Sequence, residues 1–543
     1  MNKIKKKRKR SRGKPSFITE LPLKLTIAEK RNLEKRFEAG DDVFNAVLGE
    51  SFKRREIMLN LPEYIAARNE KDKEKRKKLF ATAAQESGFR EYDLHNYGKQ
   101  FNHCWINQHL ESTMVQKIAT RAFRAVADYH FKKKGKPRFK SPKDFNSLEG
   151  KNNINGLTWC MDHVEWKTQK GIIHLQPIIN SKDEVIEHGL KSKVKYIRIV
   201  RRAGRKLDTK DYDYFVQLVS NGVPLHKKKH KQAKGKFALD IGPSTVAGVG
   251  KDFAFLVQFC SELITKRKEL RILDRQIDRQ RRANNSVNYN ANGTIKCHRY
   301  NNFDGTFKCP AYNDEKGKPL NLINYNADGS VKKWKEGNKL EWVKSNRQLK
   351  TEHKRAKLYK KMAAQRKTAH GRLINLILSH GDDIWIEKLS YVAFQKMWGR
   401  SVRDRAPGMF VELLRQKLKS RGGELHEFST YSTKLSQSCQ CGRIKKKELS
   451  ERWHECECGV IMQRDLYSAF LALFIEDDKL NAREAQKAFP GLEAVLKAAL
   501  RDTQAASGQR IVKNFPASFG FKPETELFAL KANVKAIEAA VVG

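Results

Sequence analysis

The stretch FALDIGPSTVAGVG, residues 237–250, predicts a strand, a tight turn and a second strand. Its first strand ends on Asp240, and Ile241 and Gly242 then turn the chain. A carboxylate at the end of a buried strand raises the free energy of the folded state unless it is paired or binds a cation. One such residue does not define a site, because turn and capping roles explain most of them.

Two further carboxylates occur in a similar setting. Glu387 ends the apolar run DIWIE (383–387), and Asp465 precedes LYSAFLALF (466–474), which predicts a helix. Three carboxylates at element boundaries predict a converging site for hard divalent ions, since Mg²⁺ prefers oxygen ligands. Two such ions can activate a water and stabilise the leaving oxygen in phosphodiester hydrolysis. Asp240, Glu387 and Asp465 are therefore candidate catalytic residues that bind Mg²⁺.

The composition favours a polyanionic partner. The 543 residues include 110 Lys and Arg against 61 acidic residues, a formal net charge of +49. A field of one sign on this scale favours nucleic acid. An acidic membrane is the competing partner, but no apolar run approaches the roughly 18 residues that a membrane span needs. We therefore expect no membrane partner, and the length predicts about two to four domains.

Four of the nine cysteines form two tight pairs, Cys439-x-Cys441 and Cys456-x-Cys458, with 14 residues between the pairs. The usual ribbon has C-x₂-C pairs, but a glycine after each pair lets the backbone turn tightly enough for the thiolates to converge. Four thiolates complete a closed tetrahedral site. We expect one structural Zn²⁺ there, with His454 as an alternative ligand. This uneven cysteine usage also favours a reducing compartment.

Upstream, residues 17–26 alternate like a strand, residues 28 to about 129 read as helical, and residues 155–222 read as short strands. The helix predicted over 112–134 has an apolar stripe, and a basic loop follows at 135–142. Basic residues off the stripe, in that loop and between the cysteine pairs are candidate nucleic-acid contacts: Lys117, Arg121, Arg124, Lys136, Arg138, Lys140, Lys445 and Lys446.

The ordered set DIGPSTVAG, WIEKLSY, four-cysteine ribbon and QRDLYSA resembles the split RuvC nuclease domain of TnpB proteins, the transposon-encoded relatives of compact type V CRISPR effectors. GKPRFKS, NYNANGTIK and SNRQLKTEHKRAKLYKKMAAQRK extend the resemblance over roughly residues 17–475. It implies that Asp240, Glu387 and Asp465 form the catalytic triad, and that the cysteines hold zinc in the target-nucleic-acid-binding insert. Both pairs are C-x-C, where the family usually has C-x-x-C.

The resemblance implies a multidomain α+β chain. Its parts would be a wedge β-barrel (17–27 and 136–228), a helical recognition lobe (28–135), an RNase H-like RuvC α/β nuclease domain (229–430 and 462–543) and a zinc ribbon (431–461). The basic composition of residues 1–16 predicts a disordered arm, and Asn-Gly and Asp-Gly turns predict a hairpin-like insertion in the nuclease domain at about 284–340.

By the same resemblance the protein would be an RNA-guided DNA endonuclease. A guide RNA would pair with double-stranded target DNA beside a short flanking motif, and a single RuvC site with two Mg²⁺ ions would hydrolyse the DNA. We expect a monomer or homodimer in a prokaryotic cytoplasm, associated with the nucleoid when bound to DNA. The alternatives are a DNA-joining transposase or integrase with an RNase H-like core, and a nuclease-inactive RNA-guided DNA-binding protein.

Overall fold

The computed structural model describes residues 15–142, 144–203, 212–289, 293, 342–448, 450–508 and 519–520. It divides into two compact units, Met1–Lys228 and Lys229–Gly543. The multidomain α+β class is confirmed, since both units combine helices with sheets. The basic arm, the insertion predicted at about 284–340 and the end of the chain lie almost wholly outside the described residues.

The N-terminal unit contains a seven-stranded antiparallel sheet. In spatial order its strands are β2 (Ser147–Glu149), β6 (Val194–Ala203), β7 (Tyr212–Asn221), β1 (Ser16–Lys24), β5 (Gly171–Pro177), β4 (His163–Thr168) and β3 (Leu157–Cys160). β3, at one end of this order, contacts β6 near the other end, so the sheet curves back on itself. The strands expected over 17–26, 172–178, 194–200 and 213–219 are therefore present, whereas the wedge barrel stays a prediction.

Helices occupy the chain between β1 and β2. They are α1 (Ile27–Asn60), α2 (Pro62–Asn69), α3 (Lys73–Glu86), α4 (Glu91–Gly98) and α5 (Ser112–His130), and α6 (Glu184–Leu190) follows later between β5 and β6. α1 begins at a capping box in which Thr26 and Glu29 satisfy each other's backbone amides. The apolar stripe of α5 is buried against α1 and the sheet in one shared core, as its helical spacing predicts.

The second unit is built on a mixed five-stranded sheet. Its order is β10 (Ala254–Gln258), β9 (Thr245–Gly250), β8 (Lys236–Ile241), β11 (Asp383–Glu387) and β12 (Glu424–Phe428). β10, β9 and β8 pair antiparallel, whereas β11 runs parallel to both β8 and β12. Parallel neighbours need a crossover connection, and α8 (Asn346–Leu378) supplies the one that precedes β11.

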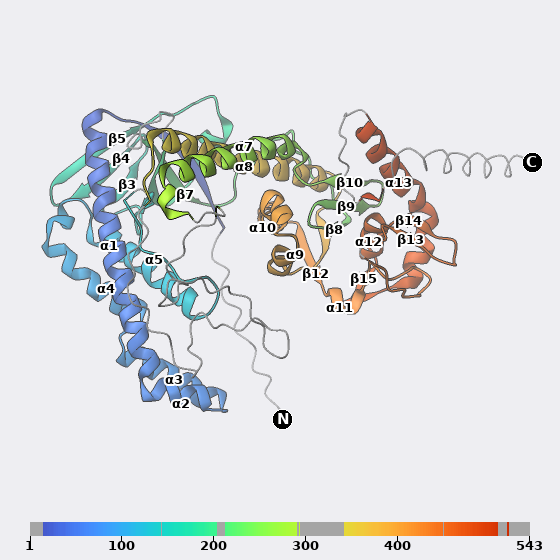
Figure 1. Ribbon diagram of the computed structural model, residues 1–543, viewed down its shortest axis with the longest axis horizontal. Coiled ribbons are helices and arrows are strands. Elements are labelled where there is room, and N and C mark those ends of the chain that lie inside the picture. Colours follow the sequence, from blue (N-terminus) through green and yellow to red (C-terminus); the bar gives the residue numbers. More distant parts are fainter. Residues whose placement is uncertain are drawn as a thin grey trace, which may run out of the picture. The chain divides into compact units, whose positions relative to one another are not determined.

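Helices cover both faces of this sheet. α12 (Arg464–Ala472) and α13 (Ala482–Gly508) pack on one face, and α8 and α10 (Pro407–Arg421) pack on the other. α7 (Ile264–Asn284) lies along α8 (Figure 1). The remaining elements of this unit are α9 (Tyr391–Arg405), α11 (Thr430–Thr433), β13 (Trp453–Glu455), β14 (Ile461–Gln463), β15 (Ile475–Glu476) and β16 (Lys479–Leu480).

None of the helices in the described parts of the chain combines the length and the apolar character that a membrane crossing requires.

The glycines of β9 permit close packing of two aromatic rings against the sheet. A Cβ on Gly248 would lie 2.5 Å from Phe255 and 2.8 Å from Phe237, both of which are buried. The two rings stack with centroids 6.1 Å apart. The small residues of TVAGVG therefore leave room for aromatic side chains that pack around β8, the strand that carries Asp240.

Gly248→Ala should destabilise the chain by about 1–3 kcal/mol, because the added methyl group overpacks a core that has no room for it. Gly371→Ala is the matched control, since nothing lies within 4 Å of a Cβ there and the position is inside helix α8. That change should stabilise the chain by about 0.5–1 kcal/mol. Urea unfolding of both variants checks the pair, and equal effects would contradict the packing argument.

Candidate active site

Strand alternation places Asp240 and Glu387 on the same face of the second unit's sheet. β8 and β11 are parallel neighbours whose register pairs Leu239 with Ile386, so Asp240 and Glu387 come next along each strand. Leu239 and Ile386 are buried in the core under α8 and α10. The next residue on each strand points to the opposite face, which α12 covers.

Asp465 joins them from the first turn of α12. The side chain of Gln463 caps this helix by accepting a hydrogen bond from the Leu466 amide at 2.8 Å. The negative charges of Asp465 and Glu387 both raise the pKa of Asp240. The three carboxylates predicted from separate stretches of sequence are therefore brought together.

Burial raises the pKa of all three carboxylates of this site. Burial, followed by the charges of Asp465 and Glu387, raises the pKa of Asp240 well above its usual range. Burial raises the pKa of Glu387 to about 7 and also raises that of Asp465, against the opposing charge of Arg464. Each carboxylate keeps some exposure to solvent. Clustered carboxylate oxygens open to solvent fit hard divalent cations such as Mg²⁺, which would relieve the repulsion.

The four predicted zinc ligands also converge. Sγ of Cys439 lies 3.5 Å from Sγ of Cys458, and Sγ of Cys441 lies 3.6 Å from Sγ of Cys456. All four sulfur atoms lie within 4.8 Å of one another, and none is in a disulfide. Zn–S bonds of about 2.3 Å in a tetrahedron require sulfur atoms about 3.8 Å apart. The cluster therefore fits Zn²⁺ despite its C-x-C spacing.

Residues 408–471 match the family model described as Cas12f1-like, TNB domain. This segment is similar to a Cas12f1-like TNB domain, and we name it the TNB domain by this similarity. It includes β12, the cysteine cluster and almost all of α10 and α12. The match confirms the predicted resemblance to compact type V CRISPR effectors.

Comparison with solved structures gives matches of low sequence identity and low TM-score. A Cas12f1–sgRNA–target DNA complex shares 10% identity over 84% of this chain and 98% of that chain, with a TM-score of 0.40. A CRISPR–Cas12f ternary complex shares 14% identity over 84% and 82%, with a TM-score of 0.25. The mini-RNA-guided endonuclease CRISPR-Cas_phi3 shares 13% identity over 60% and 57%, with a TM-score of 0.28. No curated protein sequence gives a significant match.

The cysteine cluster of the TNB domain is braced directly on α12. The Gln440 amide donates to the Tyr467 hydroxyl at 3.0 Å, and that hydroxyl lies 3.4 Å from Sγ of Cys439. Tyr467 is buried on α12, two residues after Asp465. The cluster therefore helps to fix the helix that carries the third carboxylate.

His454, the alternative zinc ligand, lies outside the four-sulfur group. Its ring stacks on Tyr467 with centroids 4.2 Å apart. Burial lowers the pKa of His454 to about 4, so the ring is neutral at physiological pH. In this structure His454 is a packing residue of the TNB domain.

Arg464 makes a second connection between the TNB ribbon and the carboxylates. Its guanidinium donates to the carbonyl oxygen of Glu451 at 2.7 Å and to that of Glu448 at 3.3 Å. Its Nε lies 3.6 Å from Oδ1 of Asp465. One buried cation therefore ties the ribbon backbone to the third carboxylate, a role that the sequence analysis did not anticipate.

Three of the candidate nucleic-acid contacts interact with other groups of the protein, and the remaining five are exposed to solvent. Arg121 lies over the Phe145 ring and donates to the Ser147 carbonyl at 3.0 Å, while Lys140 lies over the same ring and that of Phe44. Lys117 pairs with Glu149 at 3.2 Å. The exposed candidates are Arg124, which has Glu91 within 3.7 Å, and Lys136, Arg138, Lys445 and Lys446.

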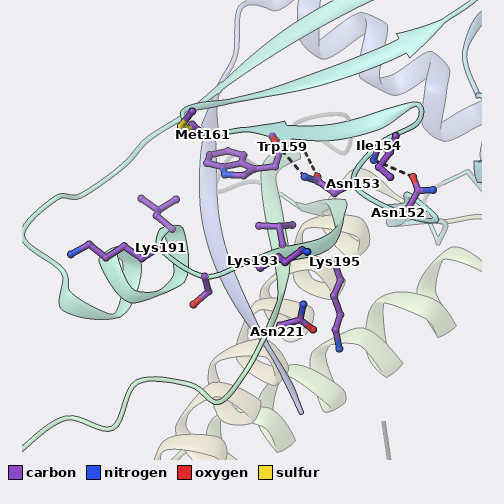
Figure 2. Close-up of a pocket in the computed structure, with 12 residues that line it drawn as sticks. Asn152, Asn153, Ile154, Trp159, Met161, Lys191, Lys193, Lys195 and Asn221 are labelled. Atoms are coloured by element: carbon purple, nitrogen blue, oxygen red, sulfur yellow. Dashed lines mark hydrogen bonds between the residues drawn. The ribbon is translucent and has the colours of Figure 1, made fainter. Parts of the chain in front are cut away.

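The N-terminal unit has a basic pocket that the sequence analysis did not predict. Its volume is about 740 Å³, and its lining combines lysines, amides and an indole (Figure 2). The labelled lining residues are Asn152, Asn153, Ile154, Trp159, Met161, Lys191, Lys193, Lys195 and Asn221. Asn153 holds the wall in shape, since its Oδ1 accepts from the Trp159 amide at 2.8 Å. Amines and an aromatic face suit a phosphate and a base.

Cys441→Ser should loosen α12 as well as the TNB ribbon, because the cluster is braced on Tyr467. Amide hydrogen exchange over 438–472 should accelerate by about tenfold or more, with α1 and α5 unchanged. Cys104→Ser is the matched control, since that thiol is exposed and far along the chain. Unchanged protection in α12 of Cys441→Ser would contradict the bracing role.

Glu387→Gln should stabilise the magnesium-free protein near pH 8. With its pKa raised from 4.5 to about 7, Glu387 binds more protons in the folded than in the unfolded state between those values. Stability therefore falls as pH rises through that window, and at high pH the loss reaches about 3 kcal/mol at most.

Thermal unfolding in the presence of a magnesium chelator tests this direction of the pH dependence. The melting temperature of Glu387→Gln should exceed that of the parent near pH 8, and the gain should shrink near pH 5. Glu412→Gln, at an exposed position of α10, should show no such dependence. A gain of the same size at both pH values would rule out the assigned shift.

Proposed function

We propose that the protein is an RNA-guided DNA endonuclease that hydrolyses phosphodiester bonds at a single RuvC-type site. The observation that carries the proposal is the convergence of Asp240, Glu387 and Asp465, the last of them within a Cas12f1-like TNB domain. A carboxylate cluster alone would suit many metal-dependent reactions. Its position beside a domain of this family narrows the substrate to a nucleic acid.

The architecture of the second unit supports an RNase H-like nuclease domain. Three antiparallel strands continue into two parallel strands, and helices cover both faces of the sheet. The carboxylates project from the ends of two adjacent central strands, β8 and β11. Such an arrangement presents charged side chains at one edge of a rigid sheet, where a bulky polymer can reach them.

Asp240, Glu387 and Asp465 would hold two Mg²⁺ ions, which when bound supply activation of a water and stabilisation of the leaving oxygen. The protein itself positions the carboxylates that would bind the ions. Burial keeps the carboxylates in a region of low dielectric, where their charges act strongly on a bound cation. Arg464 orients Asp465, and solvent access on one side leaves room for a phosphodiester.

The partners in this proposal are a guide RNA and double-stranded target DNA. A guide–target duplex is recognised mainly through its backbone and shape, while base pairing reads the sequence. The net charge of +49 and the exposed basic side chains supply that backbone recognition. We assign the N-terminal unit to the wedge and helical recognition lobe, and its basic pocket to contact with nucleic acid.

A DNA-joining transposase or integrase is the second candidate, because three carboxylates on an RNase H-like fold also suit that reaction. The four-cysteine cluster immediately before Asp465, within the same TNB domain, favours the endonuclease. A strand-transfer assay with free transposon ends separates them, since only a joining enzyme makes recombinant product. A nuclease-inactive RNA-guided binding protein is the third candidate, and the presence of all three carboxylates counts against it.

Asp240→Ala should lower DNA cleavage by about 10³-fold or more, because the variant lacks a carboxylate that neither neighbour can replace. Binding of guide RNA and target DNA should change little, since Asp240 lies beneath α12 and not on a basic surface. Cleavage is measured on a plasmid carrying the target, using protein purified with its own RNA. Binding is measured by gel shift.

Asp252→Ala is the control, because Asp252 is an exposed carboxylate in the turn between β9 and β10 of the same sheet. That variant should cut at the parent rate. Equal DNA cleavage by Asp240→Ala and Asp252→Ala would disprove the assignment of Asp240 as a catalytic residue.

A further inference from the structure

A second group of metal-ligating side chains lies in the N-terminal unit, away from the carboxylates and the TNB cysteines. Cys160, His163 and Glu165 each offer a ligand atom, and these atoms lie within 4.8 Å of one another. We name these three residues the hairpin cluster. Apart from the TNB cysteines, no other set of three or more such side chains meets this spacing in the described parts of the chain.

The β3–β4 hairpin brings the cluster onto one face of the sheet. Cys160 and His163 are cross-strand partners on either side of the turn, and Glu165 is two residues further along β4. Val164 between them is buried in the core, so His163 and Glu165 point to the opposite, outer face. All three members are half-buried, which leaves them open to an ion from solution.

His163 is oriented as a metal ligand requires. Its Nδ1 lies 2.6 Å from Oδ1 of Asp162, so that ring nitrogen donates to the carboxylate. The lone pair of Nε2 then faces Glu165, whose Oε1 lies 3.8 Å away. A carboxylate that fixes the far nitrogen of a ligating histidine is a recurrent outer contact in zinc sites. The other oxygen of Glu165 pairs with Lys167 at 3.1 Å, which holds the carboxylate in place.

A fourth side chain stands beside the cluster. His174 on β5 is the cross-strand partner of Glu165, and its ring centroid lies 5.3 Å from that of His163. It is exposed, so it can rotate toward an ion with little disturbance of the core. Thiolate, imidazole and carboxylate donors together suit a borderline metal such as Zn²⁺ rather than Mg²⁺.

We propose that Cys160, His163 and Glu165 bind a second Zn²⁺ ion, with His174 as the fourth ligand. The ion would tie the turn of the β3–β4 hairpin to β5. β3 is at the end of the sheet, where strand pairing is least supported, so a link between three strands stabilises that edge. The same hairpin supplies Trp159 and Met161 to the basic pocket, so the ion would also hold one wall of that pocket (Figure 2).

The test is the zinc content of the purified full-length chain, measured by mass spectrometry after excess metal is removed. The parent protein should carry one zinc at the TNB cysteines and one at the hairpin cluster. His163→Ala and Cys160→Ser should each lose one zinc and keep the other. Cys441→Ser should lose the TNB zinc alone, which makes the two sites separately countable.

Three controls keep the result specific. His103→Ala and Cys104→Ser change an exposed histidine and an exposed cysteine of the same unit, and both should keep two zinc ions. Cys297→Ser combined with Cys309→Ser should also keep two, because neither residue is one of the four proposed ligands. Circular dichroism of each variant checks folding, and Glu165→Gln, which preserves side-chain volume, provides a milder change that should weaken zinc retention.

Cobalt replacement gives an independent readout. A Co²⁺ ion with one thiolate ligand should give a weaker charge-transfer band than a four-thiolate site, and the band should vanish in Cys160→Ser when Cys441→Ser is also present. The proposal is overturned if the folded His163→Ala variant keeps both zinc ions. It is equally overturned if the parent carries one zinc that Cys441→Ser removes, or if the Cys297/Cys309 double variant loses the second ion.

Discussion

Burial of three neighbouring carboxylates is the constraint around which the second unit is arranged. Burial raises the pKa of Asp240, Glu387 and Asp465, and the charges of Asp465 and Glu387 raise that of Asp240 further, so that a bound cation would lower the cost of ionising them. The parallel pairing of β8 with β11 fixes two of them, and α12 brings the third. The small residues of β9 let aromatic side chains pack beneath β8, which keeps the strand in place.

Local sequence patterns were sufficient to find the candidate residues of this site. FALD and DIWIE end on acidic residues after short apolar runs, and β8 and β11 form where those runs predict strands. Paired cysteines with following glycines predict that four thiols converge, and the four sulfur atoms lie within 4.8 Å of one another. The apolar stripe of α5 is buried as its helical period requires. In each case the information lies within a window of about twenty residues, where periodicity and spacing are informative.

Contacts between residues that are far apart in the sequence could not be predicted from such local patterns. Arg121 and Lys140 were expected to meet nucleic acid, but both lie over the Phe145 ring, a contact set by the packing of α5 and the basic loop on the sheet. The hairpin cluster was not predicted, because Cys160 meets His163 and Glu165 only through the turn between β3 and β4, which the sequence analysis did not place.

Tyr467 and Arg464 join a thiolate cluster to a carboxylate cluster through one short helix. If both clusters bind ions, the two sites share a rigid element and are thermodynamically linked, and such linkage is reciprocal. Zinc on the cysteines would pre-order α12 and so lower the entropy lost when the carboxylates bind Mg²⁺. By the same coupling, occupied carboxylates would favour retention of zinc. Scarcity of either metal would then weaken the hold on both.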